Sequence, residues 1–294
     1  MLEYIEPLFR PPSEANSLIL QVTNGCSWNQ CTFCEMYTAP QKKFSTKKES
    51  LVFDEIEMAA HTYPETRRIF LADGDAMVLS TRRLLSILQH IQIHFPKVNR
   101  VSAYCLPRNI KNKSIDELKE LYNAGLGLVY VGAESGDDEL LSLINKGETL
   151  SSIVDSLQKL HTADIKTSVM ILNGLGGNLF TKQHAINSAR LVNESQPNYL
   201  ATLVISFPFG KERFLQSFPD NFQLLDQNAL FHEMEIFIDH TDLKNTIFRS
   251  DHASNYLILK GVLGKDKQKL LEKLHLARTT PEKLHLREEW QRGL

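Results

Sequence analysis

Short runs of apolar and β-branched residues recur along about the first two thirds of the chain, each bounded by turn-forming or charged residues. Continuous runs of this kind are typical of strands that are buried on both faces of a sheet. They predict strands at residues 17–22, 68–72, 100–104, 127–133, 165–172 and 199–206. Between them, apolar residues at helical spacing predict helices, most clearly over 81–95 and 114–125, where Ser114 is the expected N-cap and Gly125 the expected stop.

The alternation of strands and helices predicts a parallel sheet, because the later strands start at intervals of about one βα unit, roughly 30 residues. We expect an α/β fold, a partial (β/α)6 TIM-like barrel over residues 1–206. The first interval is longer, and its surplus is a loop at 24–38, at the strand end where such folds place their sites. Beyond it, residues 207–294 are expected to form a C-terminal helical extension packed on the barrel, with helices near 225–240 and 266–277.

The composition is that of an ordinary globular chain, with 294 residues of which 42% are hydrophobic and 23% charged, which excludes a disordered or fibrous protein. A formal net charge of -2 gives no long-range attraction to polyanions, so a dedicated binder of nucleic acid or anionic membranes is disfavoured. The local exception is a basic patch expected from Lys42, Lys43, Lys47 and Lys48.

The N-terminus lacks the basic start and apolar run of a secretory signal, and no stretch of about 18 consecutive apolar residues occurs. We therefore expect a cytoplasmic protein that has no membrane partner. Disulfides rarely persist in that compartment, so clustered cysteines are better interpreted as metal ligands or catalytic thiols.

The chain has 4 cysteines, and Cys26, Cys31 and Cys34 lie together on the loop after the first predicted strand. Thiolates select zinc or iron–sulfur clusters. A structural zinc needs four protein ligands, for which only the distant His61 offers itself as the fourth. The spacing is also that of plant-type [2Fe–2S] ferredoxins, which need a fourth cysteine, here Cys105. The remaining hypothesis is a [4Fe–4S] cluster on three cysteines, with one iron open to a ligand.

The stretch GCSWNQCTFCEMY resembles the cluster motif of the radical SAM superfamily, in the compact branch often called Fe-S oxidoreductases. That branch has four residues between its first two cysteines, where most of the superfamily has three. The resemblance continues in FLADGDAMVLST, VYVGAESGDDELLSLINKG, MILNGLGG and FRSDHASNYL, and covers roughly residues 10 to 275. It implies a partial barrel, a [4Fe–4S] cluster on Cys26, Cys31 and Cys34, and S-adenosylmethionine bound at the open iron.

The resemblance also implies the chemistry: an oxidoreductase or transferase that cleaves S-adenosylmethionine reductively to a 5′-deoxyadenosyl radical, which abstracts hydrogen from an unidentified substrate. The residues that it places at the cofactor are Phe33, Asp73, Gly74, Asp75, Glu134, Ser135, Lys146, Gly174 and Gly176. The segment from Asp73 to Asp75 stands where the family has Gly-Gly-Glu, which holds the methionine amino group. Lys146 matches a basic position that pairs with the cofactor carboxylate, although a lysine at a helix end also complements the helix dipole.

Four further residues are candidates for catalysis or substrate binding. Tyr104 and Arg108 flank Cys105 after the third predicted strand, and Cys105 itself is expected to be a small buried hydrophobic side chain. His252 and Asn255 lie in FRSDHASNY, a segment that crowds polar groups between apolar neighbours and is expected to close the open side of the barrel. The alternative for that segment is an exposed turn.

Two other functions compete with this enzyme. One is a non-catalytic iron–sulfur protein for electron transfer or sensing, which S-adenosylmethionine binding would exclude. The other is a radical SAM enzyme that modifies RNA, which the near-neutral charge and the lack of a recognisable RNA-binding appendage disfavour. The expected partners are a small-molecule or unidentified substrate and an electron donor such as flavodoxin or ferredoxin.

Overall fold

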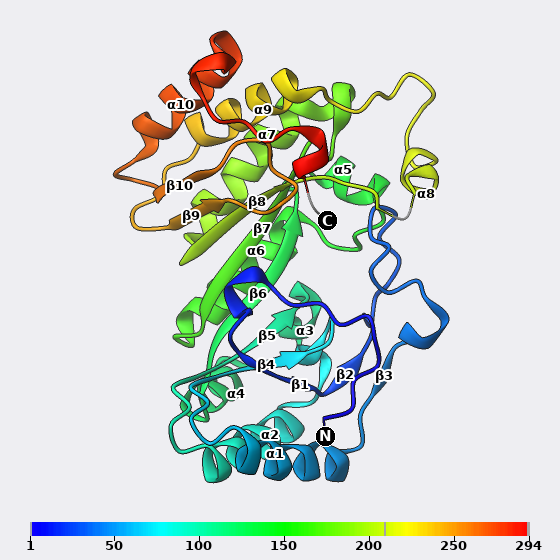
Figure 1. Ribbon diagram of the computed structural model, residues 1–294, viewed down its shortest axis with the longest axis vertical. Helices are drawn as coiled ribbons and strands as arrows, with labels where there is room; N and C mark the ends of the chain where they lie inside the picture. The colour runs from blue at the N-terminus through cyan, green and yellow to red at the C-terminus, as the bar shows by residue number, and fades with distance from the viewer. Residues whose placement is uncertain (1, 209, 293–294) are drawn as a thin grey trace. The chain divides into compact units, whose positions relative to one another are not determined.

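The computed structural model describes residues 2–208 and 210–292, and its central feature is an 8-stranded sheet in the order β1-β4-β5-β6-β7-β8-β9-β10 (Figure 1). The strands are β1 (Leu18–Gln21), β4 (Arg68–Ala72), β5 (Arg100–Cys105), β6 (Leu126–Glu134), β7 (Lys166–Asn173), β8 (Tyr199–Val204), β9 (Ile247–Ser250) and β10 (Leu259–Val262). Strand β10 is antiparallel to β9, whereas β1–β4, β4–β5, β5–β6, β7–β8 and β8–β9 pair in parallel. The predicted α/β fold with a mainly parallel sheet is confirmed.

The six predicted strands correspond to β1, β4, β5, β6, β7 and β8. In β4, for example, Ile69, Phe70 and Leu71 are all fully buried, on both faces of the sheet. This burial is why an uninterrupted apolar run marks a strand here. A separate small sheet pairs β2 (Thr23–Asn24) with β3 (Ser45–Thr46), on either side of the cysteine loop.

The helices are α1 (Glu49–Thr62), α2 (Thr81–His94), α3 (Pro107–Lys111), α4 (Ile115–Asn123), α5 (Asp138–Leu143), α6 (Leu150–Thr162), α7 (Gly177–Ser195), α8 (Glu212–Leu215), α9 (Gln227–Asp239) and α10 (Lys267–Thr279). Helices α2 and α4 confirm the two clearest predictions. Ser114 caps α4 as expected: its Oγ accepts from the Glu117 N–H at 3.1 Å, and the Glu117 carboxylate accepts from the Ser114 N–H at 2.7 Å. No helix within the described part of the chain has the length and apolar character that crossing a bilayer requires.

The chain divides into two compact units, which we describe separately. Unit 1 comprises residues 1–29, 34–131 and 156–167, and unit 2 comprises 30–33, 132–155 and 168–294. The predicted boundary at residue 206 remains a prediction.

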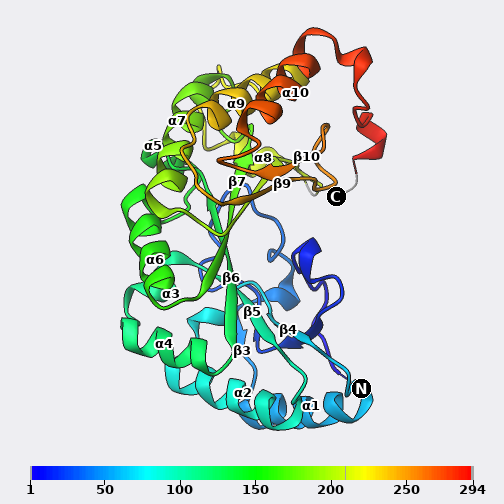
Figure 2. The same cartoon turned by 90° about the vertical axis from the view of Figure 1, so that its left-hand side faces the viewer.

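In unit 1, α1, α2 and α4 cover one side of strands β1, β4 and β5 (Figure 2). The N-terminal segment covers the other side, where Tyr4 and Leu8 pack against the core residues Ile19 and Phe70. Farther along this segment, the carboxylate of Glu14 is fully buried and is bound by three groups: it accepts from the Ser17 hydroxyl, from the Tyr130 hydroxyl at 2.6 Å and from the Arg100 guanidinium at 2.7 Å.

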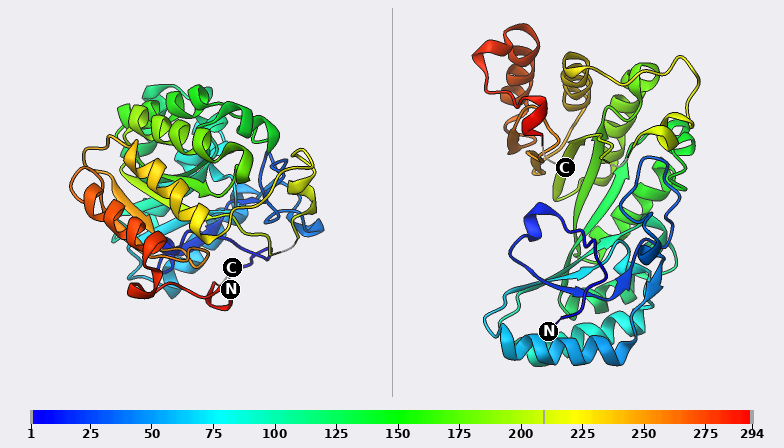
Figure 3. Two further views of the ribbon diagram at one scale, coloured as in Figure 1. Left: turned by 90° about the horizontal axis from the view of Figure 1, so that it is seen from above. Right: turned by 45° about the vertical axis from the view of Figure 1, so that its right-hand side comes forward.

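In unit 2, α7, α9 and α10 lie side by side (Figure 3). Helices α9 and α10 confirm the two helices predicted for the C-terminal part. That part was expected to be helical, but it also supplies strands β9 and β10, which continue the sheet beyond β8. These strands are short and mix polar with apolar residues, as in Ile247–Ser250, so their strand character comes from pairing rather than from sequence pattern.

Candidate active site

The three clustered cysteines lie on the loop between β2 and β3, and each is half-buried. Cys105, at the end of β5, differs from them: it is only 2% exposed, and its Sγ lies 3.3 Å from the carbonyl oxygen of Leu106. The prediction that Cys105 is a small buried side chain is confirmed. The loop thus offers a set of three thiols, Cys26, Cys31 and Cys34, that excludes the fourth cysteine of the chain.

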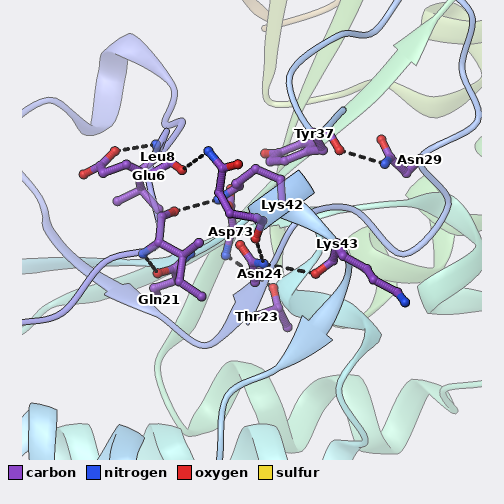
Figure 4. Close-up of polar contacts among 12 residues, drawn as sticks. Glu6, Leu8, Gln21, Thr23, Asn24, Asn29, Tyr37, Lys42, Lys43 and Asp73 are labelled. Atoms are coloured by element: carbon purple, nitrogen blue, oxygen red, sulfur yellow. Dashed lines mark hydrogen bonds and ion pairs between the residues drawn. The ribbon is translucent and has the colours of Figure 1, made fainter. Parts of the chain in front are cut away.

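Backbone geometry and side-chain amides hold the ends of the cysteine loop in unit 1. Gly25 has a φ of +68°, and a Cβ at this position would lie 2.1 Å from the carbonyl oxygen of Lys42, so only glycine fits before Cys26. The Asn24 amide donates to the carbonyl oxygens of Gln41 and Lys43, at 2.7 and 3.0 Å (Figure 4).

Residues 30–33 of the loop belong to unit 2 and have their own contacts there. The Arg213 guanidinium, from α8, donates to the carbonyl oxygen of Cys31 at 2.5 Å. The Thr32 N–H donates to the carbonyl oxygen of Ile144 at 2.9 Å. Sequence reasoning missed Arg213, because a contact between residues 182 positions apart leaves no local signal.

The turn after β4 contains two buried aspartates with different surroundings. The Asp73 carboxylate forms an ion pair with the Lys42 ammonium, and both side chains are completely buried. Lys42 also donates to the carbonyl oxygen of Ile5 at 2.8 Å (Figure 4). The four-lysine surface patch was therefore a wrong prediction, because Lys42 neutralises a buried carboxylate and Lys47 pairs with Glu55.

Asp75 has hydrogen-bond partners different from those of Asp73. Its Oδ2 accepts from the Ser27 hydroxyl, next to Cys26, and lies 3.5 Å from the Asn109 amide nitrogen. Its Oδ1 is buried and has no hydrogen-bond partner among the described residues. Burial raises the pKa of Asp75 to about 6, against the opposing effects of Ser27, Asn109 and Arg108. A carboxyl with one unsatisfied buried oxygen is suited to hold a cationic group.

Arg108 and Tyr104 occupy different surroundings near this turn. The guanidinium carbon of Arg108 lies 3.8 Å from the ring centroid of Trp28, so Arg108 stacks on the cysteine loop. The ring of Tyr104 packs edge-on against Phe70, with centroids 5.1 Å apart, and burial raises the pKa of its hydroxyl. Gly74 packs directly beneath the ring of Tyr37.

In unit 2, the predicted residues Glu134 and Lys146 form a buried ion pair with an Nζ–Oε1 distance of 3.0 Å. Glu134 ends β6 with a φ of +66°, and its Oε2 has no hydrogen-bond partner among the described residues. Two residues that the sequence placed at the cofactor for separate reasons are thus in contact.

Ser135 belongs to a buried network that the sequence did not reveal. Its Oγ lies 2.8 Å from Nδ1 of His184, whose Nε2 lies 3.0 Å from the carbonyl oxygen of Leu172. Because that carbonyl only accepts, His184 Nε2 carries a proton, and in the neutral imidazole Nδ1 accepts from Ser135. Glu233 lies beside the network, with its Oε1 3.8 Å from His184 Nε2. The same carboxylate accepts from the Gly174 N–H at 2.6 Å, and burial raises the pKa of Glu233. The Ser135 hydroxyl proton is therefore engaged within the protein.

Close packing at Gly174 and Gly176 leaves no room for a larger side chain. Gly174 has a φ of +86°, and a Cβ there would lie 2.6 Å from the Leu230 side chain. A Cβ on Gly176, which precedes α7, would lie 2.7 Å from that of Phe180. Phe33, on the cysteine loop, is half-buried.

Asn255 and His252 lie in the turn between β9 and β10. The Asn255 side chain is buried, accepting from the Val204 N–H at 2.8 Å and donating to the Thr202 carbonyl at 2.9 Å. These bonds join the turn to β8. His252 is half-buried, its Nδ1 accepts from the Ser254 N–H at 3.1 Å, and burial lowers its pKa. The substrate-binding roles of both residues remain predictions.

Comparison with known protein families decides the class of this protein. The sequence model described as the radical SAM superfamily matches residues 20–188, more than half of the chain. The chain belongs to the radical SAM superfamily. A curated relative, the 4'-phospho-dehydrooxetanocin synthase of Priestia megaterium, is 21% identical over 168 residues, which are 52% of this chain and 23% of that enzyme.

Solved structures agree on the fold. Coproporphyrinogen III oxidase from Escherichia coli, a radical SAM enzyme, matches with a TM-score of 0.57 at 16% identity, over 76% of this chain and 52% of its own. Methylornithine synthase matches with a TM-score of 0.52 at 15% identity, over 88% of this chain and 81% of its own. The methyltransferase TsrM from Kitasatospora setae, solved with cobalamin and a [4Fe–4S] cluster, matches with a TM-score of 0.51 at 20% identity, over 63% of this chain and 36% of its own.

The comparisons confirm the predicted superfamily and the partial TIM-barrel fold. A [4Fe–4S] cluster and S-adenosylmethionine, the predicted cofactors, are confirmed at the level of the family. The radical SAM chain described here spans only about half or less of the length of the synthase, the oxidase and the methyltransferase.

Proposed function

We propose that this protein is a radical SAM enzyme that binds a [4Fe–4S] cluster through Cys26, Cys31 and Cys34 and acts on a small-molecule substrate. The carrying observation is the contrast between three half-buried loop thiols and Cys105, which is enclosed in the core. Three thiolates leave one iron of such a cluster without a protein ligand. Bound there, S-adenosylmethionine would supply, on reductive cleavage, a 5′-deoxyadenosyl radical able to remove hydrogen from the substrate.

The residues of the chain would bind and orient the cofactor. Asp75, once ionised, would offer its unsatisfied Oδ1 to the methionine amino group. Lys146 offers a buried positive charge to the cofactor carboxylate, with Glu134 fixing its position. An electron donor such as flavodoxin or ferredoxin would supply the reducing electron.

The buried position of Cys105 also argues against the ferredoxin-like alternative. A [2Fe–2S] cluster with four cysteine ligands would require Cys105 to leave the core, where it is 2% exposed. A role in RNA modification loses its supporting feature, since Lys42 is fully buried rather than part of a basic surface.

A cleavage assay tests the proposed function. The anaerobically reconstituted protein, reduced with dithionite and given S-adenosylmethionine, should form 5′-deoxyadenosine, detected by mass spectrometry. The Cys31→Ala variant should form none. An intact cluster that binds no S-adenosylmethionine and yields no product would favour an electron carrier instead.

A further inference from the structure

A second group of metal-ligating side chains lies on the outer helices of unit 1. It consists of Glu57 on α1 and of His90 and His94 on α2. One ligand atom from each residue lies within 4.8 Å of the other two. His90 Nε2 is 3.1 Å from Glu57 Oε1, and His94 Nε2 is 3.9 Å from the same oxygen.

Two features of the helices fix the positions of these side chains. His90 and His94 are four positions apart, which places both imidazoles on the same face of α2, with ring centroids 4.5 Å apart. The ring of Phe53, from α1, stacks on His90 at 4.3 Å with an interplanar angle of 22° and fixes its plane. Less rearrangement is then needed for an ion to bind.

The side chains are also accessible to an ion from solvent. Those of His90, His94 and Glu57 are 19%, 30% and 50% exposed, respectively. They are therefore neither buried core groups nor fully solvated surface chains.

We propose that Glu57, His90 and His94 form a zinc site that joins α1 to α2. Two imidazole nitrogens, one carboxylate oxygen and a water are the ligands of an open zinc site, which, unlike a closed structural site, needs only three protein ligands. Tetrahedral zinc holds its nitrogen and oxygen ligands about 3.3 Å apart, close to the 3.1 Å between His90 and Glu57. Calcium and magnesium require a shell of oxygens and do not match these ligands.

The site is independent of the cysteine loop and of the proposed reaction. An ion that binds the folded protein alone raises its stability as the free ion concentration exceeds the dissociation constant. Zinc at this position should therefore raise the melting temperature without changing S-adenosylmethionine cleavage.

Equilibrium dialysis of the untagged, cluster-loaded protein against zinc tests the site under anaerobic conditions. We expect one zinc per chain with the iron content unchanged. His94→Ala and Glu57→Gln should each weaken zinc binding at least tenfold. The matched control His161→Ala, at an exposed histidine on α6, should bind zinc as the wild type does.

X-ray absorption at the zinc edge identifies the ligands. Nitrogen and oxygen neighbours alone support the proposal, whereas sulfur neighbours would place the ion on the cysteine loop and overturn it. Equal melting temperatures of the variants without zinc establish that they fold. Zinc binding that is absent from the wild type, or equal in the wild type and His94→Ala, also overturns the proposal.

Discussion

Glu134 and Lys146 are buried together, so each charge depends on the other. Removing one partner of a buried pair leaves an uncompensated charge, which costs about 3–5 kcal/mol. We predict that Lys146→Met lowers the free energy of unfolding by that amount, measured by urea denaturation of the cluster-free protein. The double variant Glu134→Gln/Lys146→Met should regain most of the loss but still bind S-adenosylmethionine poorly when cluster-loaded. A double variant as unstable as Lys146→Met would contradict this account of the pair.

The burial of Asp75 should make the stability of the protein depend on pH. Burial raises its pKa to about 6, whereas the carboxyl of the unfolded chain titrates near pH 4. Between these values the folded state binds more protons, so the free energy of unfolding falls as the pH rises. The free energy of unfolding falls by about 3 kcal/mol at most. The fall is complete once the pH is well above 6, where the carboxyl is ionised in both states.

The Asp75→Asn variant cannot titrate and should lack this fall. Without cofactors it should exceed the wild type in free energy of unfolding at about pH 7.5, and the difference should shrink by about pH 4. Urea denaturation across this range measures both proteins. A difference that does not depend on pH would show that the Asp75 carboxyl is not destabilised by burial.

At the level of elements, the start of α4 depends on local hydrogen bonds. The Ser114 hydroxyl satisfies the N–H of Glu117, one of the groups that a helix start leaves without a partner. Ser114→Ala should lower the free energy of unfolding by about 1 kcal/mol. Ser114→Asp keeps an acceptor and should stay close to the wild type in the same denaturation experiment. Equal loss in both variants would mean that the hydroxyl does not act as the cap.

Elements that depend on local patterns could be predicted from the sequence. The apolar run of β4 and the Ser114 cap each carry their signal within a few residues. Strands β9 and β10 carry no such local signal. Strand β9 pairs with β8, which lies far from it in sequence, and β10 pairs with β9. The same distance hid Arg213, which contacts Cys31.

The sequence names the residues of the candidate site but does not show how they pair with one another. The sequence marks Asp73 and Asp75 alike as acids after a strand. Only the fold shows that Lys42 forms an ion pair with Asp73, whereas the Asp75 carboxylate accepts from the Ser27 hydroxyl. The His184 network around Ser135 likewise depends on three elements meeting in unit 2.

At the scale of the whole molecule, we expect the cluster to depend on three cysteines and not on the fourth. Cys31→Ala should lose the iron and sulfide of the reconstituted protein. Cys105→Ala should keep both, because the Cys105 thiol lies in the core and its loss costs only the packing of a small side chain. Iron and sulfide analysis of the two variants checks this, and the reverse pattern would support a ferredoxin-like cluster.

The most direct test of the central claim is whether S-adenosylmethionine binds the open iron. The reduced cluster is examined by electron–nuclear double resonance with S-adenosylmethionine that carries nitrogen-15 in its amino group. We predict a magnetic coupling between the cluster and the labelled nitrogen in the wild type. An intact reduced cluster without that coupling would contradict the claim that three cysteines leave one iron for the cofactor.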